Sequence, residues 1–259
     1  MTEYRFCQVQ DEGRLRIVTL NRPEVMNALH ADAHEELEAI WDEFARSPDL
    51  WVGIVTGAGE RAFSAGNDLK VQAAGMRRPM PPTGFAGLTH RFDLEKPIIA
   101  AVNGLAMGGG FEIALACDLI IAAENALFAL PEPRVGLVAG AGGLHRLPRM
   151  IGQKQALGMI LTGRRVPAAE GLSLGFVNEV VPQGQALEAA KRWAALILEC
   201  SPLAIRASKQ AVYAGLDEES LAKAITTMYP AQARNRDSQD FIEGPKAFAE
   251  KRKPNWRNM

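Results

Sequence analysis

Two glutamates and a run of glycines are the residues in this chain best suited to chemistry. Glu112 follows Gly108–Gly110 closely, and Glu132 comes 20 positions later between two prolines. Glycine lets a backbone amide approach a ligand that a side chain would keep away. Two carboxylates can move protons on two sides of one substrate. The spacing therefore indicates an oxyanion pocket flanked by a pair of general acid/base groups.

Each of these features also has a plainer explanation. A glycine triplet often serves only close packing, and an acid at a helix N-terminus complements the helix dipole. Glu132, in a turn stiffened by Pro131 and Pro133, reads equally as a polar loop residue. Chemistry is favoured because Glu112 heads the apolar stretch 113–117, where burying an unpaired carboxylate is costly.

A second small-residue turn, Ser64–Lys70, predicts another oxyanion donor. We expect the amide of Asn67 to oppose that of Gly109, with Asp68 capping or bracing the turn. Alone this is a generic strand-to-turn signature. The glycine-rich segment Gly140–Gly143 opens a further helix and offers bare backbone near Glu132, suited to holding a water.

Strands and helices must alternate to position these turns. A helix is predicted from about Ala33, where Asp32 and Glu35 have capping-box spacing. The apolar runs between the turns suit parallel strands covered on both faces, so the fold class is α/β. These expected strands are residues 15–20, 51–56, 97–102, 118–123 and 126–130.

The pattern of apolar residues changes after about Pro182. Strand patterns disappear, and segments 185–200, 202–214 and 218–234 all have helical periodicity. Gly244–Pro245 is expected to break the chain before a last helical turn at 246–251. We therefore divide the chain into a core, residues 1–195, and a C-terminal helical region, residues 196–259.

Segment 75–87 is rich in proline and glycine and contains Arg77 and Arg78, but it shows no periodicity. Two interpretations stay open: a mobile loop at the site entrance, or a surface excursion without a role.

The composition excludes several functional classes. The chain has 259 residues, 47% hydrophobic and 23% charged, with a net charge of −1, which argues against nucleic-acid binding. Its three cysteines and four histidines form no metal or redox motif, and no nucleotide loop or nucleophile elbow occurs. Without an apolar stretch long enough to span a membrane or a secretory signal, we expect a soluble, cytoplasmic protein with no metal.

Taken together, the motifs resemble the enoyl-CoA hydratase/isomerase (crotonase) superfamily along nearly the whole chain. Within it, Gly84–Thr89, Phe111-Glu112 and the tail from Ile242 to Trp256 are similar to the carnitinyl-CoA dehydratase (crotonobetainyl-CoA hydratase) branch. The matching segments are Leu15–Pro23, Phe63–Lys70, Ala101–Gly104, Gly108–Glu112, Leu130–Glu132, Gly140–Gly143 and Phe248–Arg252.

This resemblance implies a spiral of strand-strand-helix units with a C-terminal helical trimerisation region, and a homotrimer or dimer of trimers. It assigns the oxyanion amides to Asn67 and Gly109 and the acid/base pair to Glu112 and Glu132, with Gly140 beside the catalytic water. Residues implied to contact coenzyme A are Met26, Ala65, Asn67, Asp68, Leu69, Lys70 and, across a subunit boundary, Phe248 and Lys251.

The implied activity is that of a hydro-lyase that adds water to, or removes it from, the Cα=Cβ bond of an enoyl-CoA thioester. No cofactor is expected, because coenzyme A arrives as part of the substrate. Three alternatives stay open: a carnitinyl-CoA dehydratase, an enoyl-CoA double-bond isomerase, and a non-catalytic RNA-binding or scaffold member of the fold. The acyl group is left undetermined.

Overall fold

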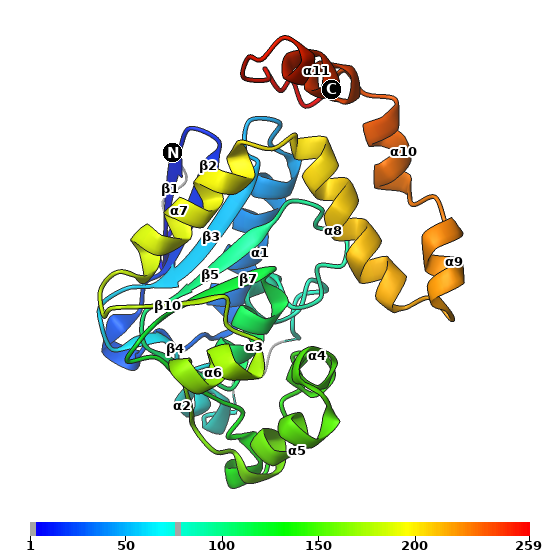
Figure 1. Ribbon diagram of the computed structural model, residues 1–259. Helices are drawn as coiled ribbons and strands as arrows, with labels where there is room; N and C mark the ends of the chain where they lie inside the picture. The colour runs from blue at the N-terminus through cyan, green and yellow to red at the C-terminus, as the bar shows by residue number, and fades with distance from the viewer. Residues whose placement is uncertain (1–3, 76–78) are drawn as a thin grey trace.

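The computed structural model describes residues 4–75 and 79–259, so Arg77, Arg78 and residues 1–3 lie outside the described residues. Its central feature is a six-stranded sheet (Figure 1). Only β1 and β2 pair antiparallel, and the other neighbours are parallel, as the continuous apolar runs predicted. In spatial order the strands are β1 (Cys7–Glu12), β2 (Leu15–Leu20), β3 (Val52–Gly57), β5 (Ile98–Val102), β7 (Leu119–Ala123) and β10 (Glu179–Val181).

A second sheet of four short strands lies beside the first. The chain passes from β3 to β4, from β5 to β6 and then helix α3, and from β7 to β8, so each turn of the chain visits both sheets. This repetition confirms the expected spiral of strand-strand-helix units. The short strands, in spatial order, are β4 (Ala62–Ser64), β6 (Leu105–Met107), β8 (Leu127–Ala129) and β9 (Val166–Pro167).

Helices cover both faces of the large sheet. Side chains alternate between the faces of a strand: Val55 packs in the cluster of α1 (Ala31–Arg46), and Ile54 in that of α7 (Ala186–Leu198). The expected core face of α1, from Leu37 to Phe44, is buried. The helix begins two residues before the predicted start, because the His30 side chain caps it by accepting from the Ala33 amide.

The remaining helices of the core lie in the connections between strands. The central one, α3, is buried through Leu115, which explains its almost wholly apolar sequence. These elements are η1 (Pro23–Val25), α2 (Leu69–Ala73), η2 (Phe85–Gly87), α3 (Gly109–Ala116), η3 (Glu132–Val135), α4 (Gly143–Ile151), α5 (Gln153–Thr162) and α6 (Ala168–Leu174).

The end of segment 75–87, from Thr83 to Gly87, is packed against the core and is not a surface excursion. The Phe85–Gly87 turn is buried, and Thr83 donates to Glu38 of α1 at 2.7 Å. The predicted mobile loop is therefore wrong for Gly84–Gly87, because an aromatic side chain anchors that end to the core.

Four helices form an arm beside the core (Figure 1): α8 (Pro202–Leu216), α9 (Leu221–Thr226), α10 (Pro230–Arg236) and α11 (Gln239–Ala249). The single helix expected over 218–234 is two helices, since Pro230 starts a new one after extended Tyr229. The break expected at Gly244–Pro245 is wrong: α11 continues through it.

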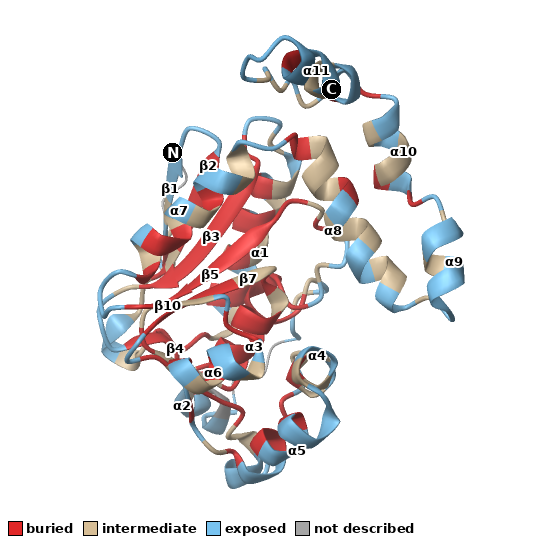
Figure 2. Cartoon of the chain, viewed as in Figure 1, coloured by how far each residue is buried: buried red, intermediate tan, exposed pale blue. Residues whose placement is uncertain are grey.

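The division between residues 195 and 196 stays a prediction, and it falls inside α7, which packs on the large sheet. Burial is concentrated in the two sheets and α3, whereas much of α9 to α11 is exposed (Figure 2). Across the described ranges, no helix combines the length and apolarity needed to cross a membrane.

Candidate active site

The N-terminus of α3 presents glycine backbone to the site. Gly108 adopts φ 53° and ψ −124°, a conformation that residues with a Cβ rarely take. The first bond into the helix runs from the Glu112 amide to the Gly108 carbonyl at 3.0 Å. The amide of Gly109, in the first turn, therefore has no acceptor within the helix.

The Ser64–Asn67 turn packs directly on this helix start. A Cβ on Gly66, which has φ 85°, would lie 2.6 Å from the Met107 carbonyl oxygen and 2.8 Å from the Gly109 nitrogen. A Cβ on Gly110 would lie 2.1 Å from the Ser64 carbonyl oxygen. Two glycine turns from separate spiral units thus fit together with no room for a side chain at either.

The Asn67 amide is oriented by the neighbouring peptide. Leu29 donates to the Gly66 carbonyl at 2.8 Å, so that carbonyl points toward Leu29. No cis peptide occurs in residues 4–75 and 79–259, and in a trans peptide the N–H points opposite to the C=O. The Asn67 N–H therefore points away from Leu29. The sequence-predicted pair of amides, Asn67 and Gly109, lies on adjoining backbone.

Glu112 is buried, with 3% of its surface exposed, and it is held from a second helix start. The Gly143 amide, at the beginning of α4, donates to Glu112 Oε1 at 2.8 Å. The pKa of Glu112 is raised to about 7: burial and the charge of Glu132 raise it, while backbone donors at Gly143 and Ala141 and the charge of Arg146 oppose the rise. A carboxyl group with this pKa suits proton transfer near neutral pH.

Glu132 begins η3 and lies against the other side of the glycine turn. A Cβ on Gly108 would lie 2.7 Å from Glu132 Oε1, so the carboxyl group rests on the Gly108 α-carbon. Burial also raises the pKa of Glu132. Its Oε2 is buried and has no hydrogen-bond partner in the described part of the chain. The negative charge of Glu132 raises the pKa of Glu112, so the two carboxyl groups are close enough to belong to one site.

The residues expected to contact coenzyme A lie mostly together. The Ala65 amide donates to the Met26 carbonyl at 2.9 Å, which joins the early loop to the Ser64–Asn67 turn. Asp68 accepts from the Val71 amide at 3.4 Å and pairs with Arg22 at 3.1 Å, so it braces the turn as predicted. Leu69 and Lys70, at the start of α2, are exposed.

Three predicted site residues lie apart from this arrangement. Gly140 is an exposed turn residue whose amide donates to the Val138 carbonyl, and the helix start that follows contacts Glu112. Phe248, 87% exposed, lies in the last turn of α11 in the arm, and Lys251 follows two residues after the end of this helix. Within one chain, α11 is remote from α3 (Figure 1).

Phe85 is a site residue that the motif reading missed. A Cβ on Gly109 would lie 2.5 Å from its ring, so Phe85 packs against the α-carbon of the residue that carries the proposed oxyanion amide. His34 fixes this turn: its ring packs 4.4 Å from that of Phe85, and its Nδ1 accepts from the Ala86 amide at 3.1 Å. Burial lowers the pKa of His34 to about 4, which keeps it neutral. The aromatic residue within Gly84–Thr89 was the available signal.

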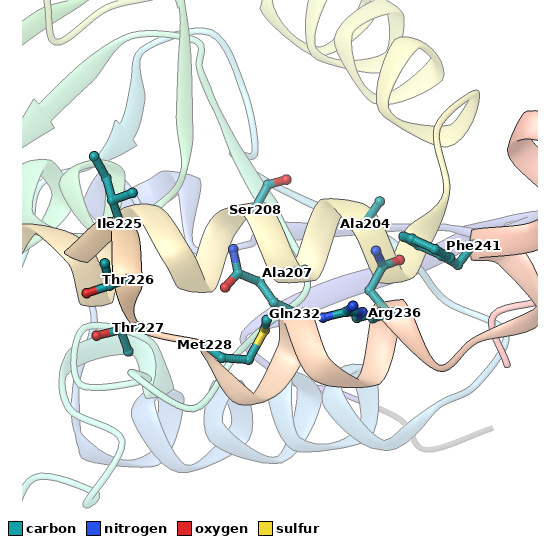
Figure 3. Close-up of a pocket in the computed structure, with 11 residues that line it drawn as sticks. Ala204, Ala207, Ser208, Ile225, Thr226, Thr227, Met228, Gln232, Arg236 and Phe241 are labelled. Carbon is teal, nitrogen blue, oxygen red and sulfur yellow. The ribbon is translucent and has the colours of Figure 1, made fainter. Parts of the chain in front are cut away.

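A separate groove of about 430 Å³ lies between α8 and the following helices of the arm (Figure 3). Its lining includes Ala207, Ile225, Met228, Gln232 and Phe241, none of which was a predicted site residue. In the described ranges, no three His, Cys, Asp or Glu side chains gather as they would around a metal ion.

Comparisons with known proteins cover nearly the whole chain. A family model described as enoyl-CoA hydratase/isomerase matches residues 11–259. Carnitinyl-CoA dehydratase of Salmonella typhi is 44% identical over 254 residues, which span 95% of both chains. The same-named protein of Escherichia coli (strain SMS-3-5 / SECEC) is 44% identical over 251 residues, again 95% of each.

Two solved structures illustrate the match in three dimensions. An enoyl-CoA hydratase from Mycobacterium tuberculosis H37Rv superposes with a TM-score of 0.92 at 38% identity, covering 98% of this chain and 99% of that one. A carnitinyl-CoA hydratase from Mycobacterium avium superposes with a TM-score of 0.79 at 39% identity, covering 99% and 100%.

Proposed function

This chain belongs to the enoyl-CoA hydratase/isomerase family, and on that premise we propose how its residues add water to an enoyl-CoA thioester or remove it. The resemblance found in the sequence is confirmed, including the similarity to carnitinyl-CoA dehydratases. The protein is accordingly a lyase that acts on coenzyme A thioesters.

In the proposed mechanism, the thioester carbonyl oxygen accepts hydrogen bonds from the amides of Asn67 and Gly109. Charge that develops on this oxygen as the enolate forms is stabilised there, and losing one such donor typically costs about 3–4 kcal/mol of barrier. Glu112 takes a proton from water while the water oxygen bonds to the β-carbon. Glu132 gives a proton to the α-carbon, and dehydration reverses both transfers.

One observation carries this proposal: two carboxyl groups with raised pKa values interact, Glu132 beside Gly108 and Glu112 beside Gly143. The pKa of about 7 lets Glu112 act as a base near neutral pH. The raised pKa of Glu132 favours the protonated form that α-protonation requires. Its buried Oε2, without a partner among the described residues, leaves an atom for substrate or water.

The finer features remain proposals. We propose that Met26, Ala65 and the Asp68–Lys70 turn hold coenzyme A, which enters as part of the substrate with no further cofactor. Phe248 and Lys251 would reach the ligand of a neighbouring subunit, since they are remote from the site of their own chain. The arm, as a trimerisation region of a homotrimer or dimer of trimers, would make that possible. A cytoplasmic location is proposed on composition alone.

A more specific candidate is the dehydration of carnitinyl-CoA. The observation that favours it is the 44% identity to proteins of that name over 95% of the chain. Isomerisation is less favoured, because the site presents a second carboxyl group that a one-base isomerase does not need.

The test replaces each glutamate by glutamine and follows loss of enoyl-thioester absorbance. We expect Glu112→Gln and Glu132→Gln each to reduce turnover by about 100-fold or more while the fold persists. Glu170→Gln, an exposed carboxylate paired with Arg164, is the matched control and should leave turnover unchanged. Hydration near the wild-type rate by both site variants would overturn the mechanism.

The acyl preference is tested with a panel of enoyl-CoA thioesters that includes crotonobetainyl-CoA. Preferred turnover of the trimethylammonium substrate would support the carnitinyl assignment. Preferred turnover of uncharged short-chain substrates would reject it, and deuterium uptake without water addition would identify an isomerase.

A further inference from the structure

Arg146 of α4 connects two parts of the candidate site that come from distant segments. Its Nη2 donates to the Thr89 carbonyl at 2.7 Å. Its Nη1 occupies the space where Gly142 would carry a Cβ, 2.2 Å from that position. The guanidinium group therefore folds back over the start of its own helix and extends to the segment after η2.

Both ends of this connection adjoin the proposed catalytic groups. On the helix side, Gly142 precedes Gly143, whose amide donates to Glu112 Oε1 at 2.8 Å. On the other side, the Thr89 hydroxyl accepts from the Phe85 amide at 2.9 Å, and the Phe85 ring covers Gly109. One side chain thus connects the helix start that supports the Glu112 carboxyl group with the turn that packs Phe85 against Gly109.

The charge of Arg146 acts on Glu112 from α4, and its guanidinium carbon also lies 5.7 Å from the centre of the Phe92 ring. No ion pair of Arg146 occurs within residues 4–75 and 79–259. Burial lowers the pKa of Arg146, and Tyr213, Cys117 and Glu112 oppose this fall. Burial raises the pKa of both the Tyr213 hydroxyl and the Cys117 thiol, so these two are neutral at pH 7. Glu112 is the remaining acid.

We propose that Arg146 is a positioning residue, which clamps the start of α4 against Glu112 and supplies the positive charge that keeps this carboxylate ready to accept a proton. The inference deepens the proposed function, because it requires Glu112 to be the base. Arg146 touches backbone and not the reacting atoms, so it acts through Glu112 and through Phe85.

The test measures the pH dependence of kcat/KM for Arg146→Gln, Arg146→Lys and a control, Arg149→Gln. Arg149 lies one turn further along α4, is exposed, and bonds only the His145 carbonyl among the described contacts. The groups that face Glu112 are Glu132 from η3, Arg146 from α4, and the amides of Gly143 and Ala141.

Removing the positive charge makes the Glu112 carboxylate harder to ionise, so the acid limb should move to higher pH. We expect Arg146→Gln to move it by about half a pH unit and to lower kcat at pH 7 roughly 3- to 10-fold. Arg146→Lys keeps the charge and should leave the limb in place, with a smaller loss of kcat because the two-armed contact is gone. Arg149→Gln should match the wild type.

A folded Arg146→Gln variant with a wild-type limb would overturn the proposal, as would an equal shift in Arg149→Gln. If Arg146→Gln does not fold, Arg146→Lys decides the matter: unchanged kcat would overturn the clamp, and a reproducible loss of kcat with KM retained would support it. An active Glu112→Gln variant would instead reject the proposed function itself, so the two failures are distinguishable.

Discussion

The spiral core and the C-terminal arm use their apolar residues in opposite ways. In the core, α3 is buried from Gly109 to Leu115, and its glycines meet backbone of the neighbouring turn. In the arm, α9 contains no buried residue, and Leu221 and Ile225 are 76% and 74% exposed. Figure 2 shows this contrast between the red interior of the core and the blue and tan helices of the arm.

The difference indicates a division of labour. A reaction that needs backbone amides in fixed positions requires tightly packed elements that hold the backbone rigidly, as in the core. Exposed apolar side chains over several helices are typical of a surface covered by another protein. We therefore assign the chemistry to the core and the proposed assembly to the arm, and four predictions can break or sharpen this comparison.

The largest effect is expected where the core has no room. Gly66→Ala would bring a Cβ against two backbone atoms at a φ of 85°, so we expect a loss of about 3 kcal/mol or more in the free energy of unfolding, or no folding. Gly175→Ala, with φ 93° but nothing within 4 Å, should lose only about 1 kcal/mol. Urea denaturation compares the two, and equal losses would contradict close packing at Gly66.

The second prediction concerns the stability cost of the site. Burial raises the folded-state pKa of Glu112 to about 7 from 4.5, so ionisation destabilises the fold as pH rises from about 4.5, and the full cost is reached above 7. Glu112→Gln removes that charge. It should therefore be about 2–3 kcal/mol more stable than wild type at pH 8, and equally stable below pH 4. Calorimetry at both pH values measures this, and a gain independent of pH would contradict it.

The third prediction is the pH dependence of activity. Glu112 must be ionised to accept a proton from water, and a pKa of about 7 leaves most of it protonated at pH 6. Hydration kcat/KM should fall roughly tenfold from pH 8 to pH 6. A profile that is flat over this range would show that Glu112 does not act as the base.

The smallest effect on the chain itself is expected in the arm. Ile225→Asp replaces a side chain that lines the arm groove and faces outward, so the stability of the single chain should change by no more than about 0.5 kcal/mol. Assembly should be weakened, as seen by sedimentation velocity. Lys223→Gln, exposed on the same helix, is the control. An unchanged mass for Ile225→Asp would argue against the proposed role of the arm.

The strands were predictable because the apolar residues within each short segment are enough to indicate a buried strand. The strands predicted at 15–20 and 97–102 match the structure to within one residue at each end. The edge strand Cys7–Glu12 was not predicted: its side chains are mostly polar and exposed, and pairing with β2 defines it. Pro245 did not break α11: the helix continues to Ala249, although Pro245 has no amide to donate to the Phe241 carbonyl.

The candidate site divides in the same way. The residue types and spacing of the glycines and of the two glutamates indicated the candidate site from the sequence. The roles of these residues remain predictions. Neither the residue type nor the spacing of Phe85 and Arg146 indicated a role in the site, because aromatic residues and arginines occur in many structural environments. Their importance comes from contacts with Gly109 and Gly142–Gly143 that only the folded chain creates.

By itself, the sequence determined the family, the α/β spiral and the two glutamates beside a glycine turn. Apolar periodicity and glycine residues can be recognised within a short segment, without knowledge of distant contacts. The tertiary structure decided which amide supports which carboxylate, how far burial raises the pKa of Glu112, and which ring covers Gly109. These properties depend on desolvation and on close contacts between spiral units, and both are set by three-dimensional packing.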